Sequence, residues 1–282
     1  MNADGVTSAT GAAGLPAVID TSKPSVARVY DCFLGGKDNY EVDRQVFAQI
    51  DSVAPQMKEL ARSGREWLIR ATRFLAGPAG MDQFLDLGAG LPSAENTHQT
   101  AQRVNPDARV VYVDNDPVVA AHGRALLEEN ELTHLVMADL TKPDEVLGHP
   151  EIVQHLELDR PFVLMQCSTL HHVPDSEKPH DIMRRYVEAL PSGSYVALIH
   201  FHDPQDGGEG TELARFVEDV FARGDMGSGY FRTREQIEAY FDGLEVLEPG
   251  LVQLNDWWPD GPALNPPTVA DKVALAGVAR KP

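Results

Sequence analysis

The chain has 282 residues, with 24 lysines and arginines against 43 aspartates and glutamates, and a formal charge of −19. Its hydrophobic fraction of 43% suits a folded protein rather than a disordered chain, and no segment has the roughly 18 consecutive apolar residues of a membrane helix. Because an acidic surface repels phosphate groups, neither nucleic acid nor an anionic membrane is expected as a partner.

The start of the chain and the two cysteines indicate where the protein works. Residues 1–22 are small and polar without hydrophobic periodicity, so we expect a disordered tail and no signal peptide. Cys32 and Cys167 lie far apart between apolar residues, which favours free thiols in a reducing compartment. We therefore expect a cytoplasmic protein, and the sequence does not indicate its oligomeric state.

Residues 23–77 are expected to be helical. Helices are predicted over 26–34, from residue 38 onward and over 57–74. Ser25 is suited to be the N-cap of the first helix, and Gly35 with Gly36 to end it. The second helix is expected to begin with a capping box, in which Asp38 is the N-cap and Glu41 follows three residues later.

After residue 77 the pattern changes to that of an α/β fold. Short apolar runs alternate with helical stretches, which is typical of a parallel sheet. The predicted strands are 84–87, 109–113, 135–138, 162–167, 195–201, 244–247 and 272–278, and the predicted helices between them are 94–104, 117–129, 144–156, 178–190, 211–222 and 234–241. The last connection, 248–271, has no helical period, so we expect the final strand to be antiparallel. Residues 78–282 are thus expected to form one α/β domain around a seven-stranded sheet.

The first predicted strand runs into a glycine turn that is suited to bind a ligand. Gly88 and Gly90 follow the strand, and glycines let the backbone approach a ligand closely at the start of a helix. A dinucleotide fingerprint would have glycine at position 93, where this chain has serine. Asp86, at the end of the strand, can accept hydrogen bonds from a ligand ammonium group. The alternative is a plain turn between a strand and a helix.

Two further acids follow the next predicted strands. Asp114 lies 24 residues after Gly90, where a carboxylate can accept both hydroxyls of a ribose, and Asp139 lies 25 residues after Asp114. Asp116 is more simply the N-cap of the next helix. Because the carboxyl ends of adjacent parallel strands meet at one edge of a sheet, we expect Asp86, Asp114 and Asp139 to form one site.

This arrangement resembles a class I S-adenosylmethionine-dependent methyltransferase over about residues 80–280. The resemblance implies a Rossmann-like sheet of seven strands with the last one antiparallel. It also implies that Asp86, Gly88 and Gly90 bind the methionine part of the cofactor and that Asp114 binds the ribose. The further cofactor positions that it implies are Asn115, Asp139, Leu140, Gln166, Cys167 and Ser168, of which the last three face the reactive sulfonium.

A closer resemblance covers the whole chain. The segments 24–31 and 34–40, together with Trp258-Pro259, are similar to a bacterial methyltransferase family long catalogued as a domain of unknown function. In that family the N-terminal helices pack over the cofactor, which implies a helical cap formed by residues 23–77. The cofactor contacts implied in this cap are Tyr30, Gly35, Gly36, Lys37 and Asn39. A Gly-Gly-Lys turn offers amides and an ammonium group to a carboxylate, although it is also suited to be a surface hinge.

Four histidines near the ends of the fourth and fifth predicted strands are candidates for a general base. They are His171, His172, His200 and His202. Histidine is the side chain that titrates near neutral pH without a perturbed pKa, and the alternative is a set of hydrogen-bonded structural residues. We expect no metal, because neither pair has the i, i+4 spacing of a zinc site on a helix. Cys167 lacks a base partner and is expected to be inert.

The sequence therefore predicts S-adenosylmethionine-dependent methyl transfer, with S-adenosylhomocysteine as the product. Direct displacement at the sulfonium needs mainly positioning and desolvation, so it requires no strong nucleophile from the protein. The acidic composition favours a small-molecule acceptor that is neutral or cationic, and the sequence does not identify it. The alternatives are an NAD-dependent oxidoreductase and a protein that binds S-adenosylmethionine without turnover.

Overall fold

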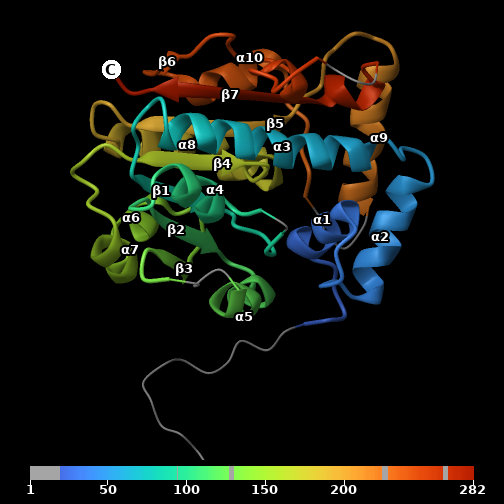
Figure 1. Ribbon diagram of the computed structural model, residues 1–282. Coiled ribbons are helices and arrows are strands. Elements are labelled where there is room, and N and C mark those ends of the chain that lie inside the picture. Colours follow the sequence, from blue (N-terminus) through green and yellow to red (C-terminus); the bar gives the residue numbers. More distant parts are fainter. Residues whose placement is uncertain (1–19, 94, 127–129, 224–227, 263–265) are drawn as a thin grey trace, which may run out of the picture.

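A computed structural model of the chain describes residues 20–93, 95–126, 130–223, 228–262 and 266–282. Most of the predicted tail lies outside these residues, and so do residue 94 and residues 127–129 of two predicted helices. The described residues form layers of helices on the two faces of a central sheet, and further helices lie at one edge of it (Figure 1).

The central sheet has seven strands in the order β3-β2-β1-β4-β5-β7-β6. Neighbouring strands from β3 to β5 are parallel, and β7 is antiparallel to both β5 and β6. The strands are β1 Gln83–Leu87, β2 Arg109–Asp114, β3 Thr133–Met137, β4 Val163–Cys167, β5 Tyr195–Phe201, β6 Glu245–Val246 and β7 Ala274–Arg280. This confirms the predicted Rossmann-like α/β fold with seven strands and an antiparallel last strand.

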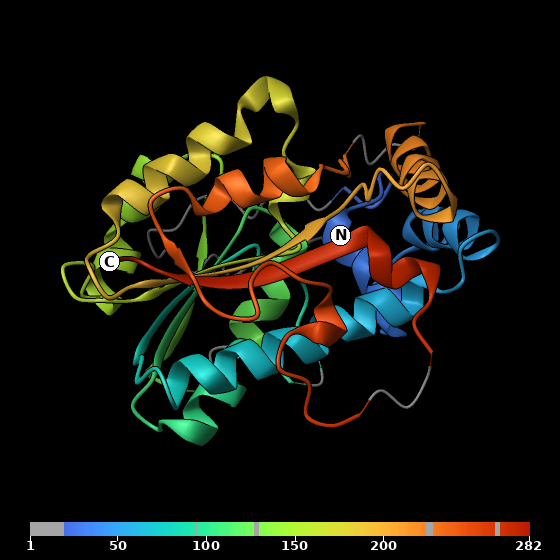
Figure 2. The ribbon, with the colours of Figure 1, turned by 90° about the horizontal axis from the view of Figure 1, so that it is seen from above.

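The sheet separates two hydrophobic cores, one on each of its faces. Val110 and Tyr112 of β2 belong to one buried cluster, whereas Val111 and Val113 belong to the other, because successive side chains in a strand point to opposite faces. The first face is covered by α3 Met57–Ala76, α4 Thr97–Val104 and α5 Pro117–Leu126, and the second by α6 Pro143–Leu147, α7 Pro150–His155, α8 Pro179–Ala189 and α10 Arg234–Glu238. Figure 2 shows α3 and α8 on opposite sides of β7.

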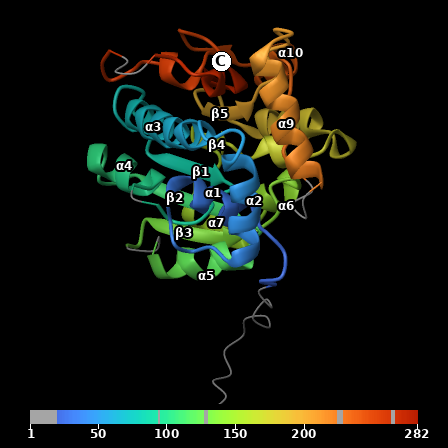
Figure 3. The ribbon, with the colours of Figure 1, turned by 90° about the vertical axis from the view of Figure 1, so that its right-hand side faces the viewer.

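Three helices gather at the carboxyl ends of the parallel strands (Figures 1 and 3). They are α1 Val26–Leu34, α2 Glu41–Asp51 and α9 Glu209–Arg223. The amide of Arg28 donates to the Ser25 hydroxyl at the start of α1, and Gly35, with φ of 76°, ends it as predicted. Residues 23–77 are thus largely helical, but only α1 and α2 lie across this edge, since α3 runs along a face of the sheet.

Local sequence signals explain two differences from the predicted helices. The predicted helix 144–156 is two helices, because Pro150 begins α7 at a position where it cannot continue the hydrogen bonds of α6. The predicted capping box at Asp38 and Glu41 is wrong: Tyr40 is the N-cap of α2, and Asp43 accepts its backbone amide at 2.7 Å.

Short 3₁₀ helices complete the described structure, and several of them lie in the long connections. They are η1 Leu170–His172, η2 Asp175–Glu177, η3 Ala239–Phe241, η4 Leu254–Asp256 and η5 Val269–Val273. Within the described ranges, every helix is too short or too polar to cross a lipid bilayer.

Candidate active site

A cavity of about 620 Å³ lies at the carboxyl ends of the parallel strands. The loops after β1, β2, β3 and β4 line one side of it, and α1, α3 and α9 line the other sides. The predicted site residues that line this cavity are Tyr30, Asp86, Gly88, Gly90, Asp114, Asn115, Asp139, Leu140, Cys167, Ser168, His171 and His172. The structure thus brings together all three predicted acids and both glycines of the turn.

The turn after β1 requires its glycines. Gly88 has φ of 82° and Gly90 has φ of 64°, a region of backbone conformation that other residues rarely adopt. A Cβ atom at Gly88 would lie 2.2 Å from Cγ2 of Thr169, so a side chain there would collide with the loop after β4. The amide of Gly88 donates to the carbonyl of Val113 at 2.7 Å, which holds the turn against the end of β2.

Asp114 is fixed by the backbone on both of its carboxylate oxygens. Oδ2 accepts the amide of Gly90 and Oδ1 accepts the amide of Asp116, each at 2.9 Å. Burial raises the pKa of Asp114, and these amide hydrogen bonds oppose that rise. Each oxygen has one further lone pair, so the carboxylate can accept two more hydrogen bonds from a ligand in the cavity.

Asp86 is a buried acid with one side-chain hydrogen bond. Its Oδ2 accepts the hydroxyl of Thr97 at 2.7 Å. Burial raises the pKa of Asp86 from 3.8 to about 6, and the Thr97 hydrogen bond and the positive charge of Arg65 oppose this rise. A cation bound beside Asp86 would favour its charged form, so the site is suited to an ammonium group.

Asp139 forms a local turn at the end of β3. Its Oδ1 accepts both the amide of Thr141 at 2.9 Å and the hydroxyl of Thr141 at 2.7 Å. The carbonyl of Leu140 accepts the hydroxyl of Tyr186 at 2.9 Å, which ties this loop to α8. Asp139 and Leu140 therefore present a fixed rim to the cavity beyond the end of β3.

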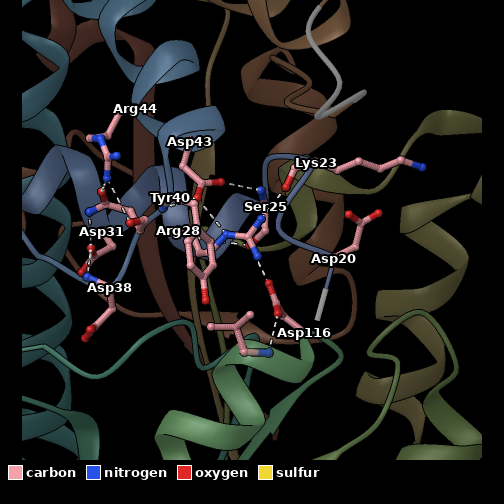
Figure 4. A network of polar contacts seen from close by, with 12 residues as sticks. Asp20, Lys23, Ser25, Arg28, Asp31, Asp38, Tyr40, Asp43, Arg44 and Asp116 are labelled. Atoms are coloured by element: carbon pink, nitrogen blue, oxygen red, sulfur yellow. Dashed lines mark hydrogen bonds and ion pairs between the residues drawn. The ribbon is translucent and has the colours of Figure 1, made fainter. Parts of the chain in front are cut away.

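A buried ion pair holds α1 and α2 over the end of β2 (Figure 4). Nε of Arg28 donates to Oδ2 of Asp43 at 2.8 Å, and Oδ1 of Asp43 accepts the amide of Ser25 at 3.0 Å. The Ser25 hydroxyl in turn donates to Oδ2 of Asp116, whose Oδ1 caps α5 through the amide of Val118. Asp116 therefore has the predicted capping role and also connects α1 to the sheet edge.

The Gly-Gly-Lys turn lies away from the main cavity. Gly35, Gly36 and Lys37 line a second cavity of about 240 Å³, which shares Ala27 and Tyr30 with the main one. Asn39 lines neither cavity, and its Nδ2 donates to Oδ2 of Asp31 at 2.8 Å and to the carbonyl of Gly36. Of the cap residues expected at the cofactor, only Tyr30 lines the main cavity, where its hydroxyl donates to the carbonyl of Ala61.

His171 and His172 lie in the wall of the main cavity with different hydrogen-bond partners. Nδ1 of His171 accepts the amide of Phe201 at 3.3 Å, so the proton of the neutral ring is on Nε2. Nδ1 of His172 lies 3.1 Å from the hydroxyl of Ser228, and donation to that oxygen leaves Nε2 with its lone pair. Burial lowers the pKa of His171 well below 6.5 and that of His172 to about 4. Both rings are therefore neutral at pH 7, and the His172 tautomer that donates to Ser228 keeps a lone pair at Nε2.

His200 and His202 do not line the main cavity. Nε2 of His200 accepts a hydrogen bond from Nη1 of Arg232 at 2.9 Å, and Nδ1 of His200 donates to the carbonyl of Phe201 at 2.6 Å. Nδ1 of His202 donates to the carbonyl of Lys272 at 2.8 Å. Burial lowers the pKa of His200 to about 3 and also lowers that of His202. These contacts match the alternative of structural, hydrogen-bonded histidines.

The end of β4 forms the middle of the cavity wall. Cys167 and Ser168 line it, whereas Gln166 is buried in the strand and its Oε1 accepts the hydroxyl of Thr169 at 2.6 Å. Burial raises the pKa of the Cys167 thiol well above 9.0, which makes the thiol a poor nucleophile. In the described part of the chain, no group of three or more histidines, cysteines and acids is placed to hold a metal ion.

The sequence prediction missed Arg65 of α3. Its side chain lines the cavity, Nη2 donates to the carbonyl of Glu95, and its positive charge favours the ionised form of Asp86. The sequence around Arg65 has the period of an ordinary amphipathic helix. Its role depends on how α3 packs against the loop after β1, which no local pattern specifies.

The fold and the cavity define a class of protein. A Rossmann-like sheet with an antiparallel seventh strand, a Gly-x-Gly turn after β1 and acids at the ends of the first three strands are the features of a class I S-adenosylmethionine-dependent methyltransferase. The family profile described as S-adenosyl methyltransferase matches residues 12–282. The chain belongs to this S-adenosyl methyltransferase family, and its cofactor is S-adenosyl-L-methionine.

Solved structures support the same assignment. A protein from Thermobifida fusca assigned as a methyltransferase is 40% identical, with a TM-score of 0.87 over 94% of this chain and 98% of that chain. A DUF574 family protein from Streptomyces avermitilis is 37% identical, with a TM-score of 0.87 over 94% of this chain and 100% of that chain. Human N-acetylserotonin methyltransferase, solved with S-adenosylmethionine, shares the fold at 14% identity and a TM-score of 0.51 over 90% of this chain and 59% of that chain. No curated protein significantly matches the chain.

These findings confirm the resemblance to a family once catalogued as a domain of unknown function. They give no support to an NAD-dependent oxidoreductase or to a protein that binds the cofactor without turnover.

Proposed function

We propose that the protein transfers the methyl group of S-adenosylmethionine to a small molecule bound in the same cavity. The observation that carries this proposal is that the cavity continues from the acids beside β1–β3 into a compartment with buried walls. Val217, Leu254 and Ala274 line that compartment and are only 0%, 2% and 1% exposed. A small molecule fits a compartment with such buried walls, whereas a macromolecular acceptor needs an open groove. The formal charge of −19 further disfavours a nucleic acid.

Three acids are suited to bind the cofactor. Asp114 would accept the two ribose hydroxyls with the lone pairs that its backbone contacts leave free. Asp86 would pair with the ammonium group of the methionine part. Asp139, with Asn115 and Leu140, would border the adenine. A Cβ at Gly90 would meet nothing within 4 Å, and this open space lets the backbone approach the cofactor.

Arg65 is better placed than Lys37 to bind the cofactor carboxylate. Arg65 lines the main cavity close enough to Asp86 to affect its pKa, whereas Lys37 lines only the second cavity. A guanidinium beside a carboxylate matches the paired negative and positive charges of an amino acid. We assign Gly35, Gly36 and Asn39 to the structure of the turn, since Asn39 and Asp31 hold it together.

The remaining residues position the reactants and move one proton. The cofactor supplies a methyl group on a positively charged sulfur, and the protein needs to hold an acceptor atom in line with it. Cys167 and Ser168, at the end of β4, separate the acid-lined end from the buried compartment. His172 would accept the acceptor proton at Nε2, because its ring is neutral and its Nδ1 can donate to Ser228. The free cysteines Cys32 and Cys167 are consistent with a reaction in the cytoplasm.

Transfer of a labelled methyl group tests this proposal. The protein would be incubated with S-adenosylmethionine carrying a tritiated methyl group and with a bacterial lysate divided into an ultrafiltrate and a macromolecular fraction. We expect label to appear in small molecules of the ultrafiltrate, and an Asp114→Asn variant to lose this transfer. Label confined to precipitable protein or nucleic acid would contradict the small-molecule acceptor, and no transfer to either fraction would contradict an active enzyme.

A further inference from the structure

We propose that the methyl acceptor is an uncharged, largely apolar molecule with one hydroxyl or neutral amino group that faces His172. This inference rests on the proposed function and specifies the chemistry of its second substrate. It concerns the part of the cavity lined by Met57, Leu60, Ile199, Val217, Phe221 and Ala274, which we call the acceptor compartment.

The order of the strands separates the acceptor compartment from the acids. Asp86 and Asp114 lie at the carboxyl ends of β1 and β2, and Asp139 lies just after β3; these strands form one half of the sheet. Ile199 and Ala274 lie on β5 and β7 in the other half. β4 lies between the two halves. Phe201 pairs with Ala274, so the carboxyl end of β5 and the amino end of β7 reach the same edge. The cavity therefore has an acid-lined end and an apolar end, with Cys167 between them.

The acceptor compartment offers no charge to a ligand. In the described part of the chain, the charged side chains that line the cavity come from residues 20–28, from Arg65 beside Asp86 and from the ends of β1–β3, and none comes from α9, β5 or β7. An ion moved from water into such a compartment loses its hydration without gaining a partner. A cationic acceptor, which the acidic composition alone left open, is therefore disfavoured together with an anionic one.

An aromatic wall and two neutral imidazoles give the compartment its selectivity. The His171 ring stacks on Phe201 with ring centroids 3.6 Å apart, and Phe201 stacks on Phe231 at 4.7 Å. Phe201 is thus held between two other rings, which makes this wall apolar and rigid. His171 has a donor at Nε2 and His172 an acceptor at Nε2, the two kinds of group with which a hydroxyl or a neutral amine forms hydrogen bonds. Transfer then breaks the S–CH₃ bond, whose electron pair stays on sulfur, forms a CH₃–O or CH₃–N bond, and moves the acceptor proton to His172.

Binding of matched probes tests the proposal on the intact protein. The protein would be saturated with S-adenosylhomocysteine, and calorimetry would measure binding of phenyl, naphthyl and biphenyl probes, each as the phenol, the aminomethyl cation and the carboxylate. We expect at least one phenol to bind at least about tenfold more tightly than both of its charged analogues. The proposal is overturned if no phenol binds, or if a charged analogue binds as tightly as the phenol on every scaffold.

A substitution in α3 provides a second, independent comparison. Met57 is the first residue of α3 and is only 6% exposed, so the carboxylate of Met57→Glu is destabilising and the helix dipole offsets only part of this cost. Circular dichroism and urea unfolding would first establish that the variant is folded. Met57→Gln is the control of nearly equal shape without the charge. We expect Met57→Glu to bind the aminomethyl cations at least about tenfold more tightly than Met57→Gln does. Equal binding by both variants would contradict an uncharged compartment around Met57.

The readouts separate this proposal from the proposed function. Binding of S-adenosylhomocysteine is measured first and depends on the acid-lined end alone. If S-adenosylhomocysteine does not bind, the proposed function fails. If it binds but the phenols show no advantage over the charged probes, the proposed cofactor site stands and only the uncharged acceptor is refuted.

Discussion

Gly88 and Gly90 have similar backbone conformations but different surroundings. A Cβ at Gly88 would lie 2.2 Å from Cγ2 of Thr169, whereas a Cβ at Gly90 would meet nothing within 4 Å. We expect Gly88→Ala to lower the free energy of unfolding by about 2–4 kcal/mol, from strain and collision together, and Gly90→Ala by only about 1–2 kcal/mol. Urea unfolding measures both. Adding Thr169→Ser, which removes Cγ2, should recover part of the Gly88→Ala loss, and equal losses for the two alanines would contradict the collision.

The pKa of Asp86 leads to a prediction for cofactor binding. In the free protein burial raises this pKa to about 6, and a bound ammonium would favour the ionised carboxylate. Affinity for S-adenosylhomocysteine should therefore be constant above a pH of about 6.5 and fall by up to about tenfold per pH unit below about 6, as Asp86 becomes protonated before binding. Calorimetry over this range measures the effect. Asp86→Asn should bind weakly without this pH dependence, and a flat wild-type profile would refute the pairing.

The sequence could predict the position of site residues that lie in a strand or in the turn that follows it. Asp86, Gly88 and Asp114 lie at fixed distances from buried strands, and the ends of parallel strands necessarily meet at one edge. The position of Lys37 depends instead on the direction in which the turn between α1 and α2 faces. Arg65 reaches the cavity only because α3 packs across the sheet, and its sequence neighbourhood does not reveal this.

At the scale of the elements, the N-terminal helices depend on one buried ion pair. Arg28 and Asp43 are 3% and 0% exposed, and removing Arg28 leaves the buried Asp43 carboxylate with backbone amides but without its positive partner. We expect Arg28→Met to lower the free energy of unfolding by about 3–5 kcal/mol and to speed amide hydrogen exchange in α1 and α2. Arg44 and Glu41 form the matched surface pair, at 50% and 70% exposure, and Arg44→Met should leave stability nearly unchanged. Similar losses for both variants would show that burial does not distinguish the two pairs.

The ends of elements show which local signals decide a structure. Gly35 ended α1 as expected, because a left-handed residue is needed there. The start of α2 was harder to predict, because the segment offers two acids, Asp38 and Asp43, that could bind the free amides there. Asp43 accepts the amide of Tyr40, and the ion pair with Arg28 of α1 holds Asp43 in this position. The residue at which α2 begins therefore depends on a contact with α1, which the sequence of the segment alone does not reveal.

At the scale of the molecule, the topology of the sheet could be predicted from the sequence more closely than the chemistry of the methyl acceptor. Alternating strands and helices limit a chain to few topologies, because crossovers between parallel strands are right-handed and short. The acceptor compartment is different, because it is formed by Met57, Val217 and Ala274, which lie far apart in the chain and have ordinary core patterns. The acidic composition suggested a neutral or cationic acceptor, and the distribution of charges inside the cavity is the basis on which we propose a neutral one.

The central claim is that S-adenosylmethionine binds across the ends of β1–β3, with Asp114 on its ribose. Calorimetric titration of S-adenosylhomocysteine into the wild-type protein, Asp114→Asn and the exposed control Asp107→Asn tests this claim most directly. The account predicts one molecule bound per chain, an affinity at least about tenfold weaker for Asp114→Asn because a charged hydrogen-bond acceptor is lost, and no change for Asp107→Asn. No binding to the wild-type protein, or equal affinity for Asp114→Asn, would contradict it.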